Sequence, residues 1–571
     1  MNLIPMPKRM ETGEGFLTKH TVCIVSQTGD ERLQKALQKL PAASGVVVME
    51  MMIADGNSER YTLTIEQERI LLTADGAQGA FYGIQTLRQI FTHEKIPCMY
   101  IEDSPDFGYR AFYQDVTRGR IPKIATLKQL VDQMAYYKLN TLQLYSEHVF
   151  DFRELKSITG RYGCITAAEI RELDEYCREN FIKLIPSLAL FGHLYELLNE
   201  EKYQHLRVLK DYKPTNIFWD ERAYHHTLDP YNPESFELVK SMLDQCMEMF
   251  SSDTVNIGCD ETFDLETFKN ANPGKLYTEF VRRIAKYLSS KGKKVMMWSD
   301  VILENMELID ELPDDITLLT WGYGKKLREK DAMQIAELGR RQILCPGCNT
   351  WTRLVEDTDI SEINIPGMAK LAARCGAVGV MNTSWGDWGQ PCCIELSMYG
   401  FLMGAETSWS VHTKIDSSFE GRANALYYRS QYGVQTVKEL SALATVVSWW
   451  HFGAAYSNRI CENGNLKVEV PSEETLTGAR KACCDLLGRV SAQKWGNENC
   501  REEVLVVAEG ILLMAEIFSK IAGYPVERTV NTEKWLAKYR REWLREDKES
   551  ELRNIEAMFR YMDKEADGKN G

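Results

Sequence analysis

The sequence lacks the features that mark a protein for nucleic acid or membranes. Its formal net charge is −14, and no cluster of lysine and arginine reverses that balance locally, which argues against nucleic acid and against a basic membrane-binding face. No run approaches the roughly 20 apolar residues that cross a bilayer, and the opening MNLIPMPKRM lacks the apolar core and cleavage site of a signal peptide. We therefore expect a soluble, cytoplasmic protein whose partners are small solutes or neutral polymers.

Metal and disulfide motifs are also missing. The nine histidines form no H-E-x-x-H pattern, and no cysteine and histidine spacing resembles a zinc site. Fifteen unevenly spaced cysteines fit reduced, buried thiols better than a disulfide scaffold. Cys345 and Cys348, in CPGC, have redox-motif spacing, but they also fit a tight Pro-Gly turn after an apolar run, which we favour. We expect no metal and no cofactor.

The chain changes texture twice along its 571 residues. Residues 1–100 combine alternating strand patterns such as RYTLTIEQERILLTA with one amphipathic helix, GAFYGIQTLRQIF, and predict a small α+β domain. Residues 101–412 alternate short apolar runs with helical patterns. Residues 413–571 are helical and charge-rich, and predict an α-helical C-terminal domain.

The middle region predicts an α/β fold of the (β/α)8 TIM-barrel type. Its eight apolar runs are YRAFYQDV, NTLQLY, KLIPSLAL, TVNIG, KVMMW, ITLLTW, QILCP and VGVMNTS. Helix starts are indicated between them, because Thr126 with Gln129 and Thr166 with Glu169 have capping-box spacing, and Pro233 follows Asn232 as in a capped first turn. Eight such repeats in about 300 residues are typical of a TIM barrel.

The active sites of TIM barrels lie at the carboxyl ends of the strands. In strand order, the polar and aromatic residues near those ends are Asp115 and Arg118, Tyr145 and Glu147, His193, Asp260 and Glu261, Trp298 and Asp300, Trp321 and Tyr323, Asn349 and Trp351, and Trp385, Asp387 and Trp388. Five of the twelve tryptophans therefore meet at one rim. Aromatic faces among carboxylates suit a sugar, whose C–H face stacks on indole while its hydroxyls need hydrogen bonds.

Two adjacent carboxylic acids, Asp260 and Glu261, follow the fourth apolar run in VNIGCDET. Taken alone, the pair could cap the next helix, where negative charge is favourable. Within the rim of tryptophans it is the best acid and base candidate on the chain.

In this order along the chain, the residues resemble glycoside hydrolase family 20, the β-N-acetylhexosaminidases. The family's fourth-strand pattern, His-x-Gly-Gly-Asp-Glu, is similar to NIGCDE at residues 256–261, with Asn256 in place of the histidine and Cys259 in place of the second glycine. The segments SPDFGYRAFYQDVTRGRIP and MAYYKLNTLQLY resemble the first two barrel strands of the family, and GAFYGIQTLRQIF resembles the helix of its small preceding domain. The resemblance covers about residues 60–400.

The resemblance implies an exo-acting, retaining enzyme that hydrolyses terminal GlcNAc or GalNAc by substrate-assisted catalysis through an oxazolinium intermediate. Glu261 would be the general acid and base, and Asp260 would hold the acetamido N–H. The implied substrate-binding residues are Arg110, His193, Trp298, Trp321, Trp351, Trp385, Asp387, Tyr323 and Glu147. Many members hold the acetamido oxygen with a tyrosine after strand seven, but CPGCNTWTRL has none; Tyr323, Tyr145 and Asn349 remain alternatives.

Two other functions stay open at this point. One is a different barrel glycosidase, or a lyase, that uses Asp260 and Glu147 as an ordinary carboxylate pair. The other is a catalytically silent carbohydrate-binding protein. For a hexosaminidase, the expected partner is a glycan or glycoconjugate that ends in N-acetylhexosamine, with no nucleic acid and no membrane, and a homodimer is one option for the oligomeric state.

Overall fold

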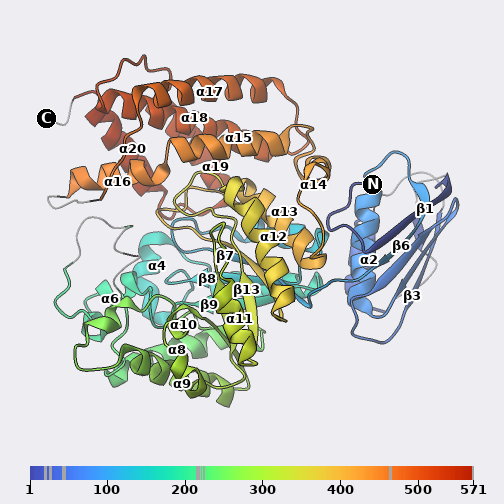
Figure 1. The fold of residues 1–571 in the computed structure, drawn as a ribbon, viewed down its shortest axis with the longest axis horizontal. Coiled ribbons are helices and arrows are strands. Elements are labelled where there is room, and N and C mark those ends of the chain that lie inside the picture. The colour runs from blue at the N-terminus through green and yellow to red at the C-terminus, as the bar shows by residue number, and fades with distance from the viewer. Residues whose placement is uncertain are drawn as a thin grey trace.

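The computed structural model describes residues 1–17, 22–24, 29–40, 47–213, 219, 222, 226–461 and 466–568. The described chain forms three adjacent parts, a small sheet with a helix at one side, a barrel in the middle and a group of helices over the barrel (Figure 1). The predicted fold class, a TIM barrel between a small α+β domain and a helical C-terminal region, is confirmed.

The N-terminal part is a six-stranded sheet in the order β1-β6-β4-β5-β3-β2. Its elements are β1 (Arg9–Phe16), β2 (Val22–Ile24), α1 (Glu31–Gln38), β3 (Val47–Ile53), β4 (Tyr61–Ile65), β5 (Arg69–Ala74), α2 (Ala77–Ile90) and β6 (Pro97–Asp103). The predicted alternation is present, since Tyr61, Leu63 and Ile65 of β4 are buried. Helix α2 lies so close to the sheet that a Cβ atom on Gly79 would be 2.5 Å from the carbonyl oxygen of Arg60.

The middle part is a closed parallel barrel. Its strands are β7 (Tyr109–Asp115), β8 (Thr141–Ser146), β9 (Lys183–Leu188), β10 (Thr254–Asn256), β11 (Lys294–Trp298), β12 (Thr317–Trp321), β13 (Gln342–Cys345) and β14 (Gly379–Ser384). Each predicted apolar run overlaps one of these strands. Pairing of β14 with β7, from Gly379 opposite Tyr109 to Ser384 opposite Gln114, closes the ring. All the carboxyl ends therefore face the same side of the barrel.

Helices connect the barrel strands, and one more, α13, follows the last strand. They are α3 (Ile124–Tyr136), α4 (Lys156–Tyr162), α5 (Ala167–Glu179), α6 (Tyr195–Asn199), α8 (Pro233–Met249), α9 (Pro273–Ser290), α10 (Asp300–Leu303), α11 (Glu329–Glu337), α12 (Thr358–Arg374) and α13 (Met398–Trp409). Two predicted helix starts are confirmed. Thr166 and Glu169 form a capping box at the start of α5, and the side chain of Asn232 caps α8.

The predicted capping box of Thr126 and Gln129 is wrong. Helix α3 begins three residues earlier than predicted, after Lys123, which makes no side-chain cap. The Thr126 hydroxyl instead donates a 2.6 Å hydrogen bond to the carbonyl oxygen of Glu546, in the C-terminal helices. Thr126 therefore bonds to a distant part of the chain and does not cap α3.

The C-terminal helices pack on the rim of the barrel. They are α14 (Ser417–Ala423), α15 (Gly433–Val446), α16 (Trp449–Ile460), α17 (Glu473–Ala492), α18 (Glu498–Ile521), α19 (Thr532–Glu546) and α20 (Leu552–Ala566). The indole N–H of Trp449 donates to the carbonyl oxygen of Trp388 at 2.9 Å, and Arg120 pairs with Asp547 at 2.6 Å. These contacts join the helices to the loops that follow β14 and β7.

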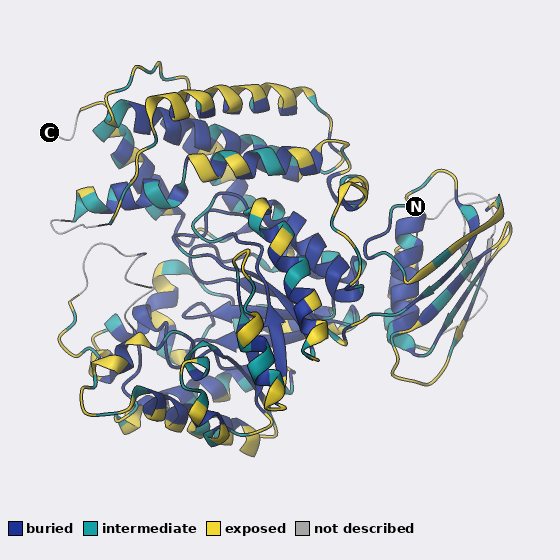
Figure 2. Cartoon of the chain, viewed as in Figure 1, coloured by how far each residue is buried: buried dark blue, intermediate teal, exposed yellow. Residues whose placement is uncertain are grey.

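Burial follows this architecture. The barrel strands and the central helix α18 are mostly buried, whereas α17 exposes its outer face (Figure 2). In the described part of the chain, none of the helices combines the length and the apolar character that a bilayer crossing requires.

Candidate active site

The chain turns sharply where β10 ends. Gly258, Cys259 and Glu261 have φ angles of 64°, 65° and 49°, in the left-handed region that residues other than glycine rarely adopt. A Cβ atom on Gly258 would lie 2.7 Å from the carbonyl oxygen of Leu188, so glycine is required there. Because these turns break the alternation of a strand, the side chains of Asp260 and Glu261 both reach one cavity.

Asn256, at the position where the resemblance expects a histidine, supports this turn. Its Oδ1 accepts the backbone N–H of Gly258 at 3.0 Å, and its Nδ2 donates to Oε1 of Gln143 at 2.9 Å. The side chain is fully buried. The amide therefore ties the turn to the neighbouring part of the barrel interior.

The cavity that receives both carboxylates has a volume of about 230 Å³. It is lined by Arg118, Asp260, Glu261, Trp298, Trp321, Tyr323, Trp351, Trp385 and Asp387. Every lining residue except Arg118 belongs to the predicted site. A larger cavity of about 830 Å³ lies between the N-terminal part and the opposite end of the barrel, but the residues that line it include no tryptophan.

Aromatic rings form the wall of the small cavity. The rings of Trp298 and Trp385 lie 5.6 Å apart between centroids, and those of Trp321 and Tyr323 are stacked at 5.2 Å. Trp298 is fully buried, so it belongs to the floor of the cavity and not to its mouth. Trp351 packs against Tyr323 at 5.0 Å and completes the wall.

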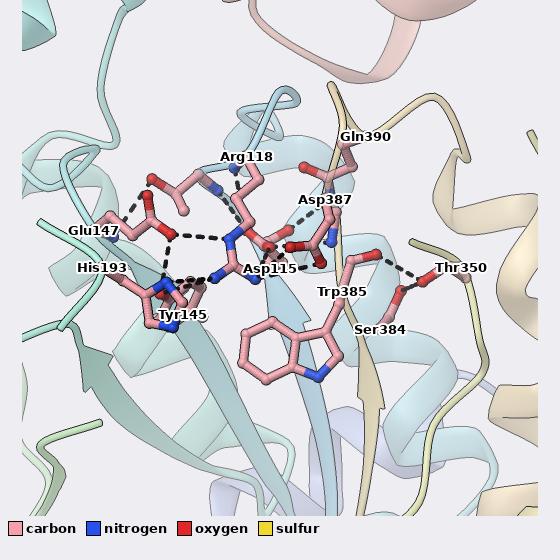
Figure 3. Close-up of polar contacts among 12 residues, drawn as sticks. Asp115, Arg118, Tyr145, Glu147, His193, Thr350, Ser384, Trp385, Asp387 and Gln390 are labelled. Atoms are coloured by element: carbon pink, nitrogen blue, oxygen red, sulfur yellow. Dashed lines mark hydrogen bonds and ion pairs between the residues drawn. The ribbon is translucent and has the colours of Figure 1, made fainter. Parts of the chain in front are cut away.

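Arg118 connects most of the polar groups of the site (Figure 3). Its Nε donates to Oε1 of Glu147 at 2.9 Å, its Nη1 lies 3.3 Å from Oδ1 of Asp387, and its Nη2 lies 3.3 Å from Nδ1 of His193. The buried carboxylate of Asp115 accepts the backbone N–H of Arg118 at 3.2 Å. The Arg118 guanidinium is therefore held in one place by partners from several strands.

The structure corrects the prediction for Arg110. This residue lies near the start of β7, at the end of the barrel away from the cavity. Its buried guanidinium donates to Oε2 of Glu59 at 2.6 Å, to the carbonyl oxygen of Phe107 at 2.7 Å and to Tyr82 Oη at 2.9 Å. Arg110 thus joins the loop before β4 and helix α2 of the N-terminal part to the barrel. Arg118, just beyond the end of β7, is the arginine that lines the cavity. Its position after the end of a predicted strand is the feature of the sequence that indicates this.

The structure does not place Glu147, a predicted substrate-binding residue, at the wall of the cavity. It is buried and does not line the cavity. Its carboxylate accepts from Arg118 and from the hydroxyl of Tyr145, which lies 3.0 Å from Oε1. Burial alone would raise the pKa of Glu147, but the positive charges of Arg118 and His193 lower it below its ordinary value. Glu147 is therefore an ionised support for Arg118.

His193 lies directly behind the carboxylate pair. Its Nε2 is 3.1 Å from Oε2 of Glu261 and 3.4 Å from Oδ2 of Asp260. Burial favours the neutral ring, but Asp260 and Glu261 outweigh it and raise the pKa of His193. His193 and Arg118 in turn overcome the effect of burial on Asp260 and lower its pKa, so Asp260 is held ionised. The ring contacts both carboxylates and is not among the residues that line the cavity, so a contact between His193 and substrate stays a prediction.

The sequence places Asp300 near the rim of the barrel and gives it no role. It opens α10, and its Oδ2 accepts the backbone N–H of Glu261 at 3.0 Å. Burial raises the pKa of Asp300 to about 7, and the nearby charge of Asp260 adds to the effect. Nothing local in the sequence separates this aspartate from an ordinary first residue of a helix.

The cluster of His193, Asp260 and Glu261 also has the compactness of a metal site. One ligand atom from each residue comes within 4.8 Å of the others. Here, however, the imidazole Nε2 faces both carboxylates, and Arg118 contributes a further positive charge. The arrangement fits an ion-paired acid and base set.

Two family models match the chain. The model described as Glycosyl hydrolase family 20, catalytic domain, matches residues 146–364, and domain 2 of the same family matches residues 1–104, so that together they cover more than half of the chain. A β-hexosaminidase of Porphyromonas gingivalis is 23% identical over 407 residues, covering 61% of this chain and 50% of the relative. A β-hexosaminidase of Akkermansia muciniphila is 30% identical over 228 residues, covering 36% and 45%. The chain spans about half the length of these curated relatives.

Solved structures share the fold. A β-N-acetylhexosaminidase from Bacteroides fragilis superposes with a TM-score of 0.60 at 20% identity, over 74% of this chain and 94% of that one. A chitobiase from Flavobacterium johnsoniae superposes with a TM-score of 0.62 at 15% identity, over 98% and 99%. Together with the matches to both family models, the closed barrel and its preceding domain show that this chain belongs to glycosyl hydrolase family 20.

Proposed function

We propose that the protein is an exo-acting β-N-acetylhexosaminidase that releases a terminal N-acetylhexosamine by substrate-assisted catalysis. The observation that carries the proposal is the shared cavity of Asp260 and Glu261, walled by four tryptophans and one tyrosine. A walled cavity at the end of a barrel suits the terminal sugar of a chain better than an internal one. The names of the relatives, β-hexosaminidase, support the same substrate class.

The chemistry follows from the positions of the two acids. The 2-acetamido oxygen of the sugar attacks C1 while the bond from C1 to the glycosidic oxygen breaks, and Glu261 gives its proton to that oxygen. The sugar becomes a cyclic oxazolinium. Water then attacks C1 and opens this ring, and Glu261 takes the proton that the water releases. Two displacements at C1 retain the β configuration.

Asp260 has the complementary task. As the oxazolinium forms, positive charge develops on the acetamido nitrogen, and an ionised carboxylate beside its N–H stabilises that charge. The lowered pKa of Asp260, caused by His193 and Arg118 against the effect of burial, supports this role.

The acetamido oxygen needs a hydrogen-bond donor, and Tyr323 is the best of the three alternatives. Tyr323 lines the cavity, and its hydroxyl accepts the indole N–H of Trp385 at 2.8 Å, so its own proton is not used in that bond. The Tyr145 hydroxyl already donates to Glu147. The Asn349 amide donates to the carbonyl oxygen of Gly347 at 2.8 Å and lies outside the cavity lining.

We assign the binding of the outer sugar hydroxyls to Arg118 and Asp387, in place of the Arg110 and Asp387 that the resemblance implies. Both line the cavity and pair with each other at 3.3 Å, and the Asp387 side chain is 30% exposed. Together they offer donors and acceptors to sugar hydroxyls.

A conventional pair of carboxylates receives less support. That mechanism needs a second carboxylate about 5 Å from the acid and free to attack C1. Of the neighbouring acids, Glu147 is buried in contact with Arg118 and Tyr145, and Asp387 is paired with Arg118.

The deciding experiment is hydrolysis of an aryl N-acetyl-β-glucosaminide followed by proton NMR. We expect turnover with the β anomer of the sugar appearing first, and little turnover of the aryl β-glucoside that lacks the acetamido group. Equal rates on both sugars would favour a conventional glycosidase. Binding of the sugar without turnover of either would favour a silent carbohydrate-binding protein.

A further inference from the structure

Glu261 needs support for its backbone. Its φ of 49° is a left-handed conformation, which costs free energy for a residue with a side chain. Strand β10 has already ended at Asn256, so no strand ladder receives the Glu261 N–H. The hydrogen bond that this N–H makes is the one to Oδ2 of Asp300, at 3.0 Å.

Asp300 is well placed to supply that support. It follows Trp298, the last residue of β11, by two positions, and it begins α10, which is anchored by the hydrogen bond from the Leu303 N–H to the carbonyl oxygen of Ser299 at 2.8 Å. A carboxylate held by a strand end and a helix is a fixed acceptor. It connects the acid-bearing turn after β10 to the next strand of the barrel.

We infer that Asp300 is the positioning residue of the general acid: its carboxyl group holds the backbone of Glu261 in the left-handed turn that directs the Glu261 side chain into the cavity. The inference rests on the proposed role of Glu261 as the acid. Asp300 itself does not line the cavity, and it acts through the backbone of its neighbour.

The charged and titratable groups around Asp300 indicate whether its carboxyl group is neutral or ionised when it accepts the Glu261 N–H. The groups that face it are Asp260 and Glu261 from the turn, Cys259 from the same turn and Tyr277 from α9. None of these is a cation, so the surroundings favour the neutral carboxyl group, in agreement with its raised pKa. A neutral carboxyl group still has a carbonyl oxygen that accepts the Glu261 N–H. Asparagine retains that acceptor, whereas alanine does not.

The test compares Asp300→Asn and Asp300→Ala with two N-acetyl-β-glucosaminides, one with an activated aryl leaving group and one with an alkyl leaving group. For Asp300→Ala we expect kcat/KM on the alkyl substrate to fall by about 10²-fold, the lower end of what a general acid contributes. The activated substrate should lose far less, because its leaving group needs little protonation. For Asp300→Asn, kcat/KM should stay within about threefold of the wild type on both substrates at pH 6, because asparagine keeps the acceptor. A threefold change corresponds to less than about 1 kcal/mol of activation free energy.

Asp229→Ala is the matched control. Asp229 is another buried carboxylate that accepts a backbone N–H, from Tyr231 at 3.0 Å, but it lies outside the cavity lining. Its loss should lower the melting temperature without changing the ratio of rates on the two substrates. An equal loss of activity on both substrates for Asp300→Ala would indicate a general structural effect and would overturn the inference, as would an Asp300→Asn variant as impaired as Asp300→Ala.

Crystal structures of the two variants make the test independent of turnover. We expect the asparagine variant to keep Glu261 left-handed and the alanine variant to lose that conformation. An unchanged Glu261 in the alanine variant would overturn the inference. If the wild type fails to hydrolyse either substrate, the proposed function is wrong, and these structures still decide whether Asp300 positions Glu261.

Discussion

The hydroxyl oxygen of Tyr323 accepts the indole N–H of Trp385 at 2.8 Å. The bond joins the end of β12 to the end of β14 across the cavity. The tyrosine proton takes no part in it, because an indole N–H can only donate. The phenol proton therefore remains for a second partner: the Thr383 hydroxyl is one within reach, and we propose that the acetamido oxygen is the other.

Replacing Tyr323 with phenylalanine tests that assignment. We expect Tyr323→Phe to lower kcat/KM on an N-acetyl-β-glucosaminide by about 10- to 10²-fold, because the acetamido oxygen loses its donor and the Trp385 N–H loses its acceptor. The control is Tyr428→Phe, which removes a buried hydroxyl far along the chain that has no hydrogen-bond partner among the described residues. Normal activity of Tyr323→Phe would return the choice to Tyr145 and Asn349.

The acid role of Glu261 predicts a dependence on the leaving group. Glu261→Gln should slow hydrolysis of a substrate with a poor leaving group by about 10² to 10⁴. An activated aryl glycoside should be affected far less in its first step. Glu266→Gln, at an exposed position five residues further on, serves as the control. The same loss for both leaving groups would mean that Glu261 is not the acid.

Asp260→Asn separates a catalytic aspartate from a helix cap. The short helix that follows spans Phe263–Thr267 and has Thr262 at its cap position, so Asp260 does not cap it. We expect a folded variant whose kcat falls by about 10²-fold or more, because an amide cannot carry the charge that stabilises the oxazolinium. A near-normal kcat, measured under saturating substrate, would contradict the assignment.

The two arginines of the β7 region should fail in different ways. Arg118→Lys should raise KM and lower kcat/KM by about tenfold or more, because lysine cannot reproduce a fork that contacts Glu147 and Asp387 together. Arg110→Lys should lower the melting temperature and leave KM unchanged, since Arg110 joins the N-terminal part to the barrel through Glu59. A raised KM for Arg110→Lys with an unchanged KM for Arg118→Lys would indicate that Arg110 binds the sugar.

Asp300 predicts a pH dependence of stability. Its pKa is raised to about 7 in the folded protein by burial and by Asp260, whereas an aspartate in the unfolded chain titrates near 3.9. Between about pH 4 and pH 7 the folded state holds a proton that the unfolded state has released, so this group makes the free energy of unfolding fall as pH rises.

Asp300→Asn should remove that contribution. As pH rises from about 4 to about 7, the melting temperature of the variant minus that of the wild type should therefore increase. Above that range the difference should be constant. Calorimetry at several pH values measures it. A difference that is the same at all pH values would show that Asp300 titrates as an ordinary aspartate.

Local sequence patterns were enough to predict the barrel and most of its rim. Each apolar run with its following helical pattern is a local signal, and eight in succession have one common solution in a closed parallel sheet. Parallel strands bring all their carboxyl ends to one side. The order of the strands along the chain therefore sufficed to predict that four of the five rim tryptophans and the Asp260-Glu261 pair share one cavity. The fifth, Trp388, packs instead against Trp219 and Trp450.

Which polar groups meet in that cavity depends on the assembled fold. A strand rises about 3.3 Å per residue, so Arg110 at the start of β7 and Arg118 beyond its end lie on opposite sides of the barrel, although the segment contains both. Which arginine faces the cavity depends on where the strand begins and ends, and sequence patterns place such boundaries poorly.

Local sequence patterns could not predict the hydrogen bond that supports Glu261, because its partner lies far away in the chain. Its left-handed backbone depends on a carboxylate 39 positions later in the chain, at Asp300. The Thr126 hydroxyl was likewise taken by Glu546, from the C-terminal helices. Contacts between segments far apart in the chain form only when the whole fold is assembled, and in both places they override what the neighbouring residues alone would favour.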